Sequence, residues 1–226
     1  MEDILAGVTW YRQSSVRIQR GGLDVFVDPW GVTHETEADY ILLTHPHYDN
    51  FSEADIARIR GPTTMVVAPA SMKKQLLEPD HLLRPGDLLQ LEGIDVLAVP
   101  AYNREKKFHP PESGWLGYVF TLGGVTYYHA GHTDLLESMH QIRCDVAFLA
   151  CDGHYTMSPE DAAQAAEVCG AEVAVPIHWG DAVASREDAE KMVRHFDGEV
   201  VLLDRAAESD EGVEDEDLTG DSRVAP

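Results

Sequence analysis

Residues 40–50 read Tyr-Ile-Leu-Leu-Thr-His-Pro-His-Tyr-Asp-Asn, a polar cluster that directly follows an apolar run. The apolar residues 40–43 predict a buried strand. His45 and His47 stand two residues apart in the loop that leaves this strand, so both rings can turn toward one point. Asp49 adds a carboxylate. Zinc accepts mixed nitrogen and oxygen ligands at about 2.0–2.2 Å, and this stretch can therefore form the nucleus of a metal site.

Further histidines follow other expected strands. Ligands delivered from several strand ends onto one rim are typical of sites that a rigid scaffold builds on its loops. One such histidine is more often structural. Five loops with the same pattern, including the loop of His45 and His47, favour a shared site. The histidines concerned are His109, His129, His132, His154 and His178.

The first half of the chain consists mainly of β-rich runs, and in the second half expected strands and helices alternate. A Gly-Gly turn at 123–124 predicts a hairpin of residues 117–122 and 125–129. Ser52 and Ser158 are expected helix caps, and a further helix is expected to start at Ser185. Two sheets packed together with helices outside, a four-layer αββα sandwich of mixed α/β (α+β) class, are predicted. The expected strands are 8–12, 16–19, 23–27, 40–43, 64–68, 88–91, 94–99, 117–122, 125–129, 146–149, 173–177 and 199–203, and the expected helices are 52–60, 158–170 and 185–196.

The composition limits the partners. Among 226 residues, 40 Asp and Glu oppose 17 Lys and Arg, a formal net charge of −23. Nucleic acid is disfavoured as a partner, because phosphate binding needs clustered Lys and Arg. No run of about 18 apolar residues could span a membrane, and the first residues lack the features of a signal peptide. We expect a cytoplasmic protein that binds neither nucleic acid nor membrane.

The acidic residues concentrate at the C-terminus. Residues 205–226 hold eight acids and two arginines and almost no large apolar residue. Such a stretch cannot bury enough apolar surface to offset its ordering entropy. The predicted organisation is therefore one domain over residues 1–204 and an acidic disordered tail over 205–226.

The histidine motifs and several other short stretches carry a family resemblance. The chain resembles metallo-β-lactamase-fold proteins, and it is similar to the microbial branch of metal-dependent hydrolases related to ascorbate-6-phosphate lactonases. The resemblance spans residues 6 to about 204 and implies an αββα sandwich with a metal site at one edge between the sheets. The matching stretches are Val27-Asp28-Pro29, Leu43-Thr44-His45-Pro46-His47-Tyr48-Asp49, Val99-Pro100-Ala101-Tyr102-Asn103, Phe108-His109-Pro110, Tyr128-His129-Ala130-Gly131, Gly153-His154-Tyr155-Thr156-Met157 and Pro176-Ile177-His178.

The resemblance also implies a ligand set. His45 and His47 would bind a first metal, joined by a histidine from the loop after the mid-chain strand, for which His109 is the candidate. Asp49 and His178 would bind a second metal. Asp28 would be an outer residue that fixes the histidine loop, since such partners orient metal ligands.

Two positions depart from the family pattern. Asn50 stands where the family has a second-metal histidine, and His132 replaces the aspartate that bridges two metals. Losing a negative charge from between two dications costs several kcal/mol by Coulomb scaling, even at an effective dielectric of about 20. We therefore predict about one metal per chain, with His45, His47 and His132 as ligands and His109 or water completing the shell. Zn²⁺ is expected first, with Mn²⁺ or Fe²⁺ also suited to these ligands.

The predicted activity is metal-dependent hydrolysis of a small-molecule ester, lactone or phosphoester by a metal-bound hydroxide. Asp49 would orient or deprotonate the water, and His178 or His154 would stabilise the oxyanion or the leaving group. The alternative is a degenerate member of the fold that binds metal or ligand without turnover. A nuclease is disfavoured by the acidic charge. The sequence leaves the oligomeric state open.

Overall fold

The computed structural model describes residues 3–33, 36–76, 79–181 and 183–206. Within these residues the first half of the chain forms a six-stranded sheet in the order of the sequence. Its first three strands are antiparallel, and the third to sixth strands are parallel. The strands are β1 (Val8–Trp10), β2 (Val16–Arg20), β3 (Leu23–Val27), β4 (Tyr40–Leu42), β5 (Met65–Pro69) and β6 (His81–Leu83).

The second half forms a seven-stranded sheet in the order β13-β12-β11-β10-β9-β8-β7. Strands β7 to β10 form an antiparallel meander, and β10 to β13 are parallel. The predicted hairpin turn at 123–124 joins two of them. The strands are β7 (Leu88–Leu91), β8 (Ile94–Pro100), β9 (Leu116–Leu122), β10 (Val125–His129), β11 (Val146–Ala150), β12 (Val173–Ile177) and β13 (Glu199–Val200).

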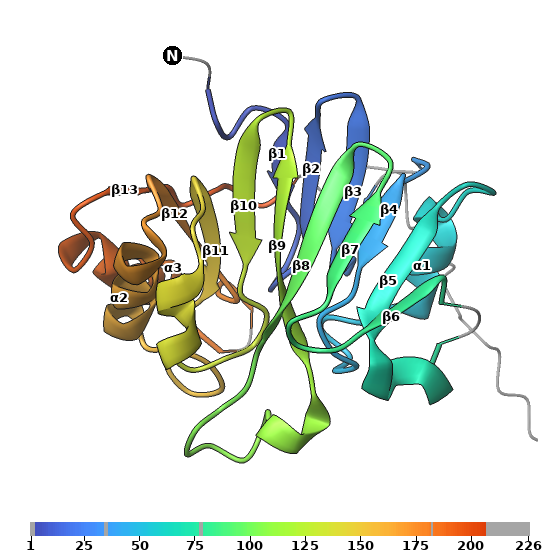
Figure 1. Ribbon diagram of the computed structural model, residues 1–226. Helices are drawn as coiled ribbons and strands as arrows, with labels where there is room; N and C mark the ends of the chain where they lie inside the picture. The colour runs from blue at the N-terminus through green and yellow to red at the C-terminus, as the bar shows by residue number, and fades with distance from the viewer. Residues whose placement is uncertain (1–2, 34–35, 77–78, 182, 207–226) are drawn as a thin grey trace, which may run out of the picture.

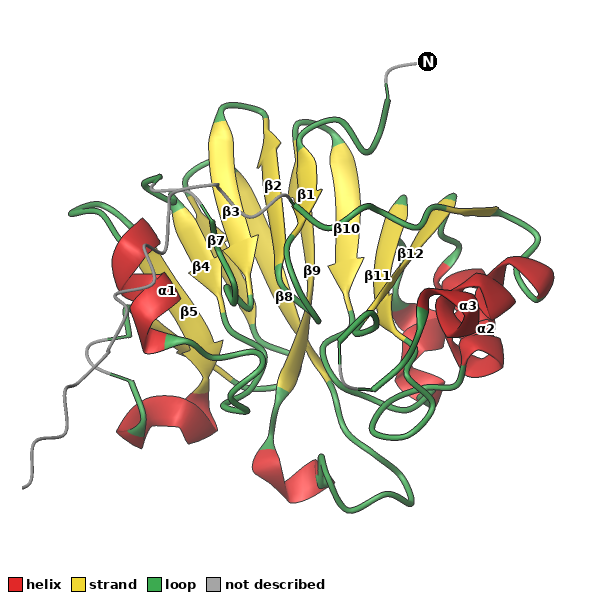
Figure 2. Ribbon diagram, turned by 180° about the vertical axis from the view of Figure 1, so that it is seen from behind, coloured by secondary structure: helices red, strands yellow, loops and turns green. Residues whose placement is uncertain are grey.

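Helices flank the two sheets on both sides, as the two opposite views of Figures 1 and 2 show. Helix α1 (Glu53–Ile59) covers the first sheet, and α2 (Pro159–Cys169) and α3 (Arg186–Glu190) lie beside the second. The mixed α/β class predicted from the sequence is confirmed. Short 3₁₀ helices complete the fold: η1 (Ala70–Lys74), η2 (Pro111–Ser113), η3 (Glu137–Gln141) and η4 (Lys191–Arg194).

Local sequence explains the helix ends. The side chains of Ser52, Ser158 and Ser185 each accept a backbone N–H of the first turn, as predicted for Ser52 and Ser158. Gly170 ends α2 at a φ of 68°, which glycine adopts without a steric penalty. The third helix is shorter than predicted, because the chain tightens into 3₁₀ geometry after Glu190.

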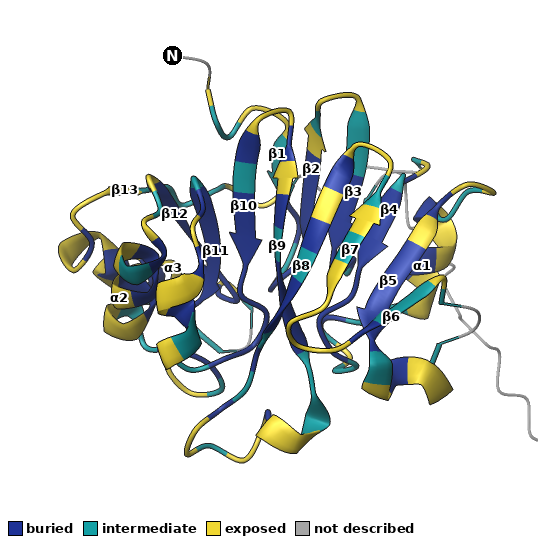
Figure 3. Ribbon diagram, in the orientation of Figure 1, coloured by how far each residue is buried: buried dark blue, intermediate teal, exposed yellow. Residues whose placement is uncertain are grey.

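The strands of the first sheet alternate between two cores. Val25, Val27 and Leu42 point into the core between the sheets, whereas Phe26 and Ile41 belong to the core under α1. This follows from the period of two along a strand. Figure 3 shows the buried residues concentrated in the strands, with exposed residues at the turns and outer helix faces.

The long connection between β8 and β9, which contains η2, projects beyond the sheets at the lower edge in Figure 1. The loops after β10 and β4 leave at this same edge. The chain also extends its contacts past the predicted boundary at residue 204: Arg205 bridges to Trp10, and the N–H of Ala206 donates to its carbonyl. The remainder of the predicted tail, residues 207–226, lies outside the described residues. None of the described helices is long and apolar enough to span a membrane.

Candidate metal centre

His45 is held by a hydrogen-bond chain that begins at the buried Asp28. The carboxylate of Asp28 accepts from the backbone N–H of Thr44 at 2.7 Å and from its hydroxyl at 2.5 Å. Because Thr44 has donated its one hydroxyl proton, its Oγ1 accepts from Nδ1 of His45 at 2.8 Å. A lone pair is thereby left on Nε2 of His45, a buried atom without a hydrogen-bond partner among the described residues. A metal ion fits this atom, since ligating histidines use their other nitrogen for such a bond.

His109 is oriented in the same way by Asn103. The amide oxygen of Asn103 accepts from the backbone N–H of His109 at 3.1 Å and from its Nδ1 at 2.8 Å. The amide nitrogen donates to Asp134 at 2.9 Å and to the carbonyl of Tyr155 at 3.0 Å. These four bonds use the amide fully and define its orientation. His109 therefore carries its proton on Nδ1 and presents the lone pair of Nε2.

His132 meets His109 at close range. Nδ1 of His132 lies 3.2 Å from Nε2 of His109, and its Nε2 lies 3.0 Å from the hydroxyl of Ser14. The hydroxyl can accept a proton from Nε2, and Nδ1 then carries a lone pair that faces that of His109. Two nitrogens that bind one tetrahedral zinc at about 2.0–2.1 Å lie roughly 3.3 Å apart. The observed separation suits a shared cation.

Four imidazoles converge at this point. One ligand atom from each of His45, His47, His109 and His132 lies within 4.8 Å of those of the others. The ring centroid of His45 lies 4.4 Å from that of His132 and 4.7 Å from that of His47. Trp115 packs against three of the rings, at 5.1 Å from His45. The loops after β4, β8 and β10 thus bring together four imidazoles that could hold a metal ion.

The four imidazoles are kept neutral, as metal binding requires. Burial lowers the pKa of His109 to about 4, and the neighbouring histidines add to the effect. Burial also lowers the pKa of His45 and of His132 well below the usual range, again helped by the adjacent imidazoles. Burial also lowers the pKa of the half-buried His47.

A second ligand group shares His132 with the first. It contains Asp49, His132 and His178, whose ligand atoms lie within 4.8 Å of one another. Nε2 of His178 lies 3.2 Å from the carboxylate of Asp49, and Nδ1 lies 3.0 Å from that of Asp152. Although burial opposes protonation, the hydrogen bonds with the two carboxylates raise the pKa of His178. Burial would raise the pKa of Asp49, but the bond and charge of His178 lower it.

Asn50 contacts Asp28, the carboxylate that holds the loop of the first ligand group. Its amide nitrogen donates to Asp28 at 3.0 Å, and its buried oxygen has no hydrogen-bond partner among the described residues. Burial raises the pKa of Asp28 to about 7, against the hydrogen bonds from Thr44 and Asn50. Asn50 therefore belongs to the hydrogen-bonded base of the histidine loop.

Two histidines of the sequence pattern lie elsewhere. Nε2 of His129 donates to the carbonyl of Ser14 at 2.9 Å, and Nδ1 accepts the N–H of Gly131 at 3.3 Å, so both nitrogens are used. His154 is exposed and packs against Phe108 and Tyr155, with ring centroids 5.5 and 4.5 Å away. The predicted ligands therefore converge, whereas His154, predicted to be catalytic, does not line their cavity.

A cavity of about 340 Å³ opens onto both ligand groups. Gln13, Tyr48, Phe108, Tyr155 and Val183 complete its wall. This volume lies at the lower end of the range for small-molecule sites, roughly 300–1,000 Å³. The site can thus admit a small substrate beside the ligand nitrogens.

Two residues that line this cavity, Gln13 and His178, have a positive φ. The non-glycine residues of positive φ among those described are Gln13 at 44°, Asp28 at 48° and His178 at 62°. Gln13 also accepts the backbone N–H of His178 at 2.8 Å through its carbonyl oxygen. Sparsely populated backbone conformations persist where the surroundings hold them, and they cluster at functional sites.

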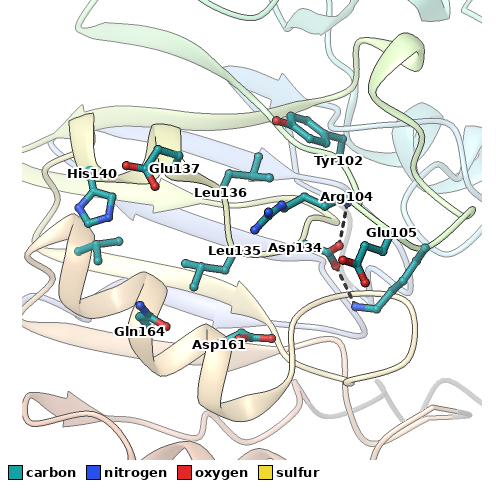
Figure 4. Close-up of a pocket in the computed structure, with 12 residues that line it drawn as sticks. Tyr102, Arg104, Glu105, Asp134, Leu135, Leu136, Glu137, His140, Asp161 and Gln164 are labelled. Carbon is teal, nitrogen blue, oxygen red and sulfur yellow. Dashed lines mark hydrogen bonds and ion pairs between the residues drawn. The ribbon is translucent and has the colours of Figure 1, made fainter.

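A larger cavity, of about 570 Å³, has Asp134 in its wall (Figure 4). Two of its charged side chains form an ion pair, in which Asp134 accepts from Lys106 at 2.8 Å. Asp134 also accepts from the backbone N–H of Arg104 at 2.8 Å. Tyr102 lies in the wall of this cavity. Neither ligand group reaches this cavity.

Sequence reasoning missed several residues of the site. Asn103, Ser14 and Asp152 were not predicted to act there, yet each holds a ring nitrogen of a histidine. Asn103 and Asp152 share one signal, a short polar side chain just after an apolar strand. Ser14 lies 118 residues from its partner, and no local pattern indicates it.

Known proteins are similar to this chain in sequence and in fold. The sequence pattern of the Beta-lactamase superfamily domain matches residues 7–178. A UPF0173 metal-dependent hydrolase of Geobacillus sp. (strain WCH70) is 32% identical over 206 residues, covering 82% of this chain and 91% of the relative. Another, of Methanopyrus kandleri, is 28% identical over 221 residues, covering 87% and 96%.

A solved structure is also similar. A protein from Parabacteroides distasonis ATCC 8503, proposed to be a metal-dependent hydrolase, superimposes with a TM-score of 0.78 at 27% identity. The match covers 88% of this chain and 93% of that protein. The chain thus belongs to the β-lactamase superfamily, in its branch of UPF0173 metal-dependent hydrolases.

Proposed function

We propose that this metal-dependent hydrolase acts with one divalent cation, held by His45, His47, His109 and His132. The observation that carries the proposal is the place of His132 in both ligand groups. A carboxylate can bridge two cations through two oxygens, but a neutral imidazole offers one lone pair. A cation in the four-histidine group therefore takes His132 away from the second group. Zn²⁺ suits the nitrogen ligands, as do Mn²⁺ and Fe²⁺.

The rest of the second group supports this proposal. Without His132 it retains Asp49 and His178. Both nitrogens of His178 face carboxylates, at 3.0 and 3.2 Å. In that setting the ring serves as a double donor and not as a ligand. Asn50 stands where the family has a histidine ligand of the second metal, and its amide nitrogen donates to Asp28.

The chain's own groups then divide the hydrolytic work. A bound cation supplies Lewis acidity, which lowers the pKa of water and polarises a carbonyl. Asp49, a member of the second ligand group, accepts a proton from the attacking water. His178 donates a hydrogen bond to the developing oxyanion or to the leaving oxygen. Asp152 holds the imidazole of His178 in the orientation that this requires.

The cavity and the cysteines support the remaining assignments. A cavity of about 340 Å³ fits a small molecule. Cys144, Cys151 and Cys169 are free and buried, which suits the reducing cytoplasm. We assign the protein a small-molecule substrate and a cytoplasmic location.

Binding without turnover is the second candidate function, and His132 and Asn50 are the features that favour it. Metal analysis of the purified protein, paired with ester hydrolysis assays, separates the two. We expect about one equivalent of metal and measurable turnover. His132→Asp combined with Asn50→His should raise the content to about two equivalents, and His45→Ala should abolish binding. His129→Gln is the control with unchanged content.

Two results would reject the single-metal hydrolase. Two equivalents in the unmodified chain would refute the stoichiometry. One equivalent without turnover, when the double variant gains activity, would establish the binding role.

A further inference from the structure

The wall of the metal-site cavity is poor in charge. Among its described lining residues none is Lys or Arg, and Asp49 is the only carboxylate. Two basic side chains of neighbouring segments are paired with carboxylates: Lys106 lies 2.8 Å from Asp134, and Arg12 lies 2.7 Å from Asp181. A phosphate or carboxylate on the substrate would therefore find no bidentate or ammonium partner in this wall.

Aromatic side chains take the place of charges. Tyr48 is 79% exposed and Phe108 is 41% exposed, and both line the cavity. They come from different loops, and each is adjacent in sequence to a histidine of the metal centre, His47 and His109 respectively. Exposed large apolar side chains at a cavity mark binding surfaces. A ring stacked here would lie beside the histidine cluster.

Both aromatic rings are supported from behind. The ring of Phe108 lies 4.6 Å from that of Tyr155 in an edge contact, and Tyr48 meets Trp30 at 6.5 Å. These contacts limit the motion of the two rings without burying them. Pre-organised aromatic side chains bind planar apolar groups with little loss of conformational entropy.

One uncharged polar group completes the wall. Gln13 is 4% exposed, and its amide oxygen has no hydrogen-bond partner among the described residues. A neutral amide in such a position can bond a hydroxyl or amide of a ligand. It offers no net charge to an anion.

We propose, on the basis of the hydrolase function above, that the substrate is an uncharged carboxylic ester or lactone with a planar apolar group. That group lies against Phe108 and Tyr48, and the carbonyl faces the histidine cluster. In the reaction the water oxygen bonds to the carbonyl carbon and the acyl–oxygen bond breaks. One proton of the water ends on the leaving oxygen, and the products are an acid and an alcohol. The absence of Lys and Arg from the described lining residues favours this uncharged ester over a phosphoester.

The test compares substrates with one leaving group on the metal-loaded protein. We expect p-nitrophenyl phenylacetate to be hydrolysed, and p-nitrophenyl phosphate and bis(p-nitrophenyl) phosphate not to be. Phe108→Ala and Tyr48→Ala should each raise KM for the phenylacetate about tenfold, the scale of an aromatic contact. The effect should shrink for p-nitrophenyl acetate, which lacks the acyl ring. Leu88→Ala, at an exposed residue of β7, is the matched control.

Binding of phenylacetamide, an uncharged analogue, tests the same inference without turnover. Calorimetry should detect binding that weakens about tenfold in Phe108→Ala, while phenyl phosphate does not bind. If phosphoesters are hydrolysed, or if neither aromatic variant changes KM or binding, the substrate class is refuted while the hydrolase stands. If no ester is hydrolysed but phenylacetamide binds through Phe108, the hydrolase fails and the ligand class is supported. Absence of both refutes both.

Discussion

The carboxylate of Asp152 lies 3.0 Å from Nδ1 of His178, and both side chains are buried. Asp152 also accepts the backbone N–H of Tyr155 at 2.6 Å and that of His154 at 2.8 Å, together with the hydroxyl of Thr156. These three donors fix the carboxylate of Asp152, and the carboxylate in turn restricts the orientation of the His178 ring. Asp152 is therefore a positioning residue, which sets the direction in which Nε2 of His178 points.

Asp152→Asn should lower kcat by about 10- to 100-fold, the usual effect of losing a carboxylate behind a site histidine. The amide keeps the size of the side chain but cannot stabilise a protonated imidazole. Steady-state kinetics over a pH series checks this, because the acidic limb of the profile should shift together with kcat. A fall in KM alone, with kcat unchanged, would contradict a positioning role.

Asn103→Ala should weaken metal binding by about 10- to 100-fold, since Asn103 sets the proton of His109 on Nδ1. It also leaves the buried backbone N–H of His109 unpaired, which costs roughly 1–3 kcal/mol. Metal titration with a competing chelator and denaturant unfolding measure the two effects. His154→Ala, which changes an exposed ring, should leave the affinity unaltered. Equal affinities of wild type and Asn103→Ala would refute the assignment.

Removal of the metal should lower the melting temperature. An ion that binds the folded state alone stabilises it by about 2.7 kcal/mol at a free concentration 100 times Kd. Calorimetry with and without EDTA measures the shift. His45→Ala should melt at the same temperature in both buffers, because its ligand set is incomplete. A wild-type melting temperature indifferent to chelator would show that no ion is held there.

His129 predicts a pH dependence of stability that is separate from metal binding. Burial lowers its pKa to about 4. The unfolded chain takes up a proton below pH 6.5, and the folded chain resists it. The contribution of the neutral His129 to the free energy of unfolding is complete above pH 6.5. About 3 kcal/mol of it is lost as the pH falls toward 4.

Denaturant unfolding in EDTA, at pH 7.5 and pH 4.5, tests this effect. His129→Gln should be less stable than wild type at pH 7.5, and the gap should narrow by about 2–3 kcal/mol at pH 4.5. Parallel pH curves for the two proteins would contradict the neutral buried histidine.

The sequence by itself determined the framework of the protein. Apolar runs, serine caps and the Gly-Gly turn predicted the main strands and helices, because they act over a few residues. The spacing of His45, His47 and Asp49 after β4 predicted the start of the metal centre. Two changed family positions, Asn50 and His132, predicted where the site would depart from its relatives.

Only the tertiary structure decided which histidines face the metal. His129 and His132 lie three residues apart, yet one donates to the carbonyl of Ser14 and the other joins the cluster. The period of a strand fixes the direction of its side chains, but it ends where the loop begins. Beyond that point each ring is aimed by a partner distant in sequence. Ser14 comes within hydrogen-bond range of His132 only when the two sheets pack, whereas Asp152 meets His178 because β11 and β12 pair side by side in one sheet.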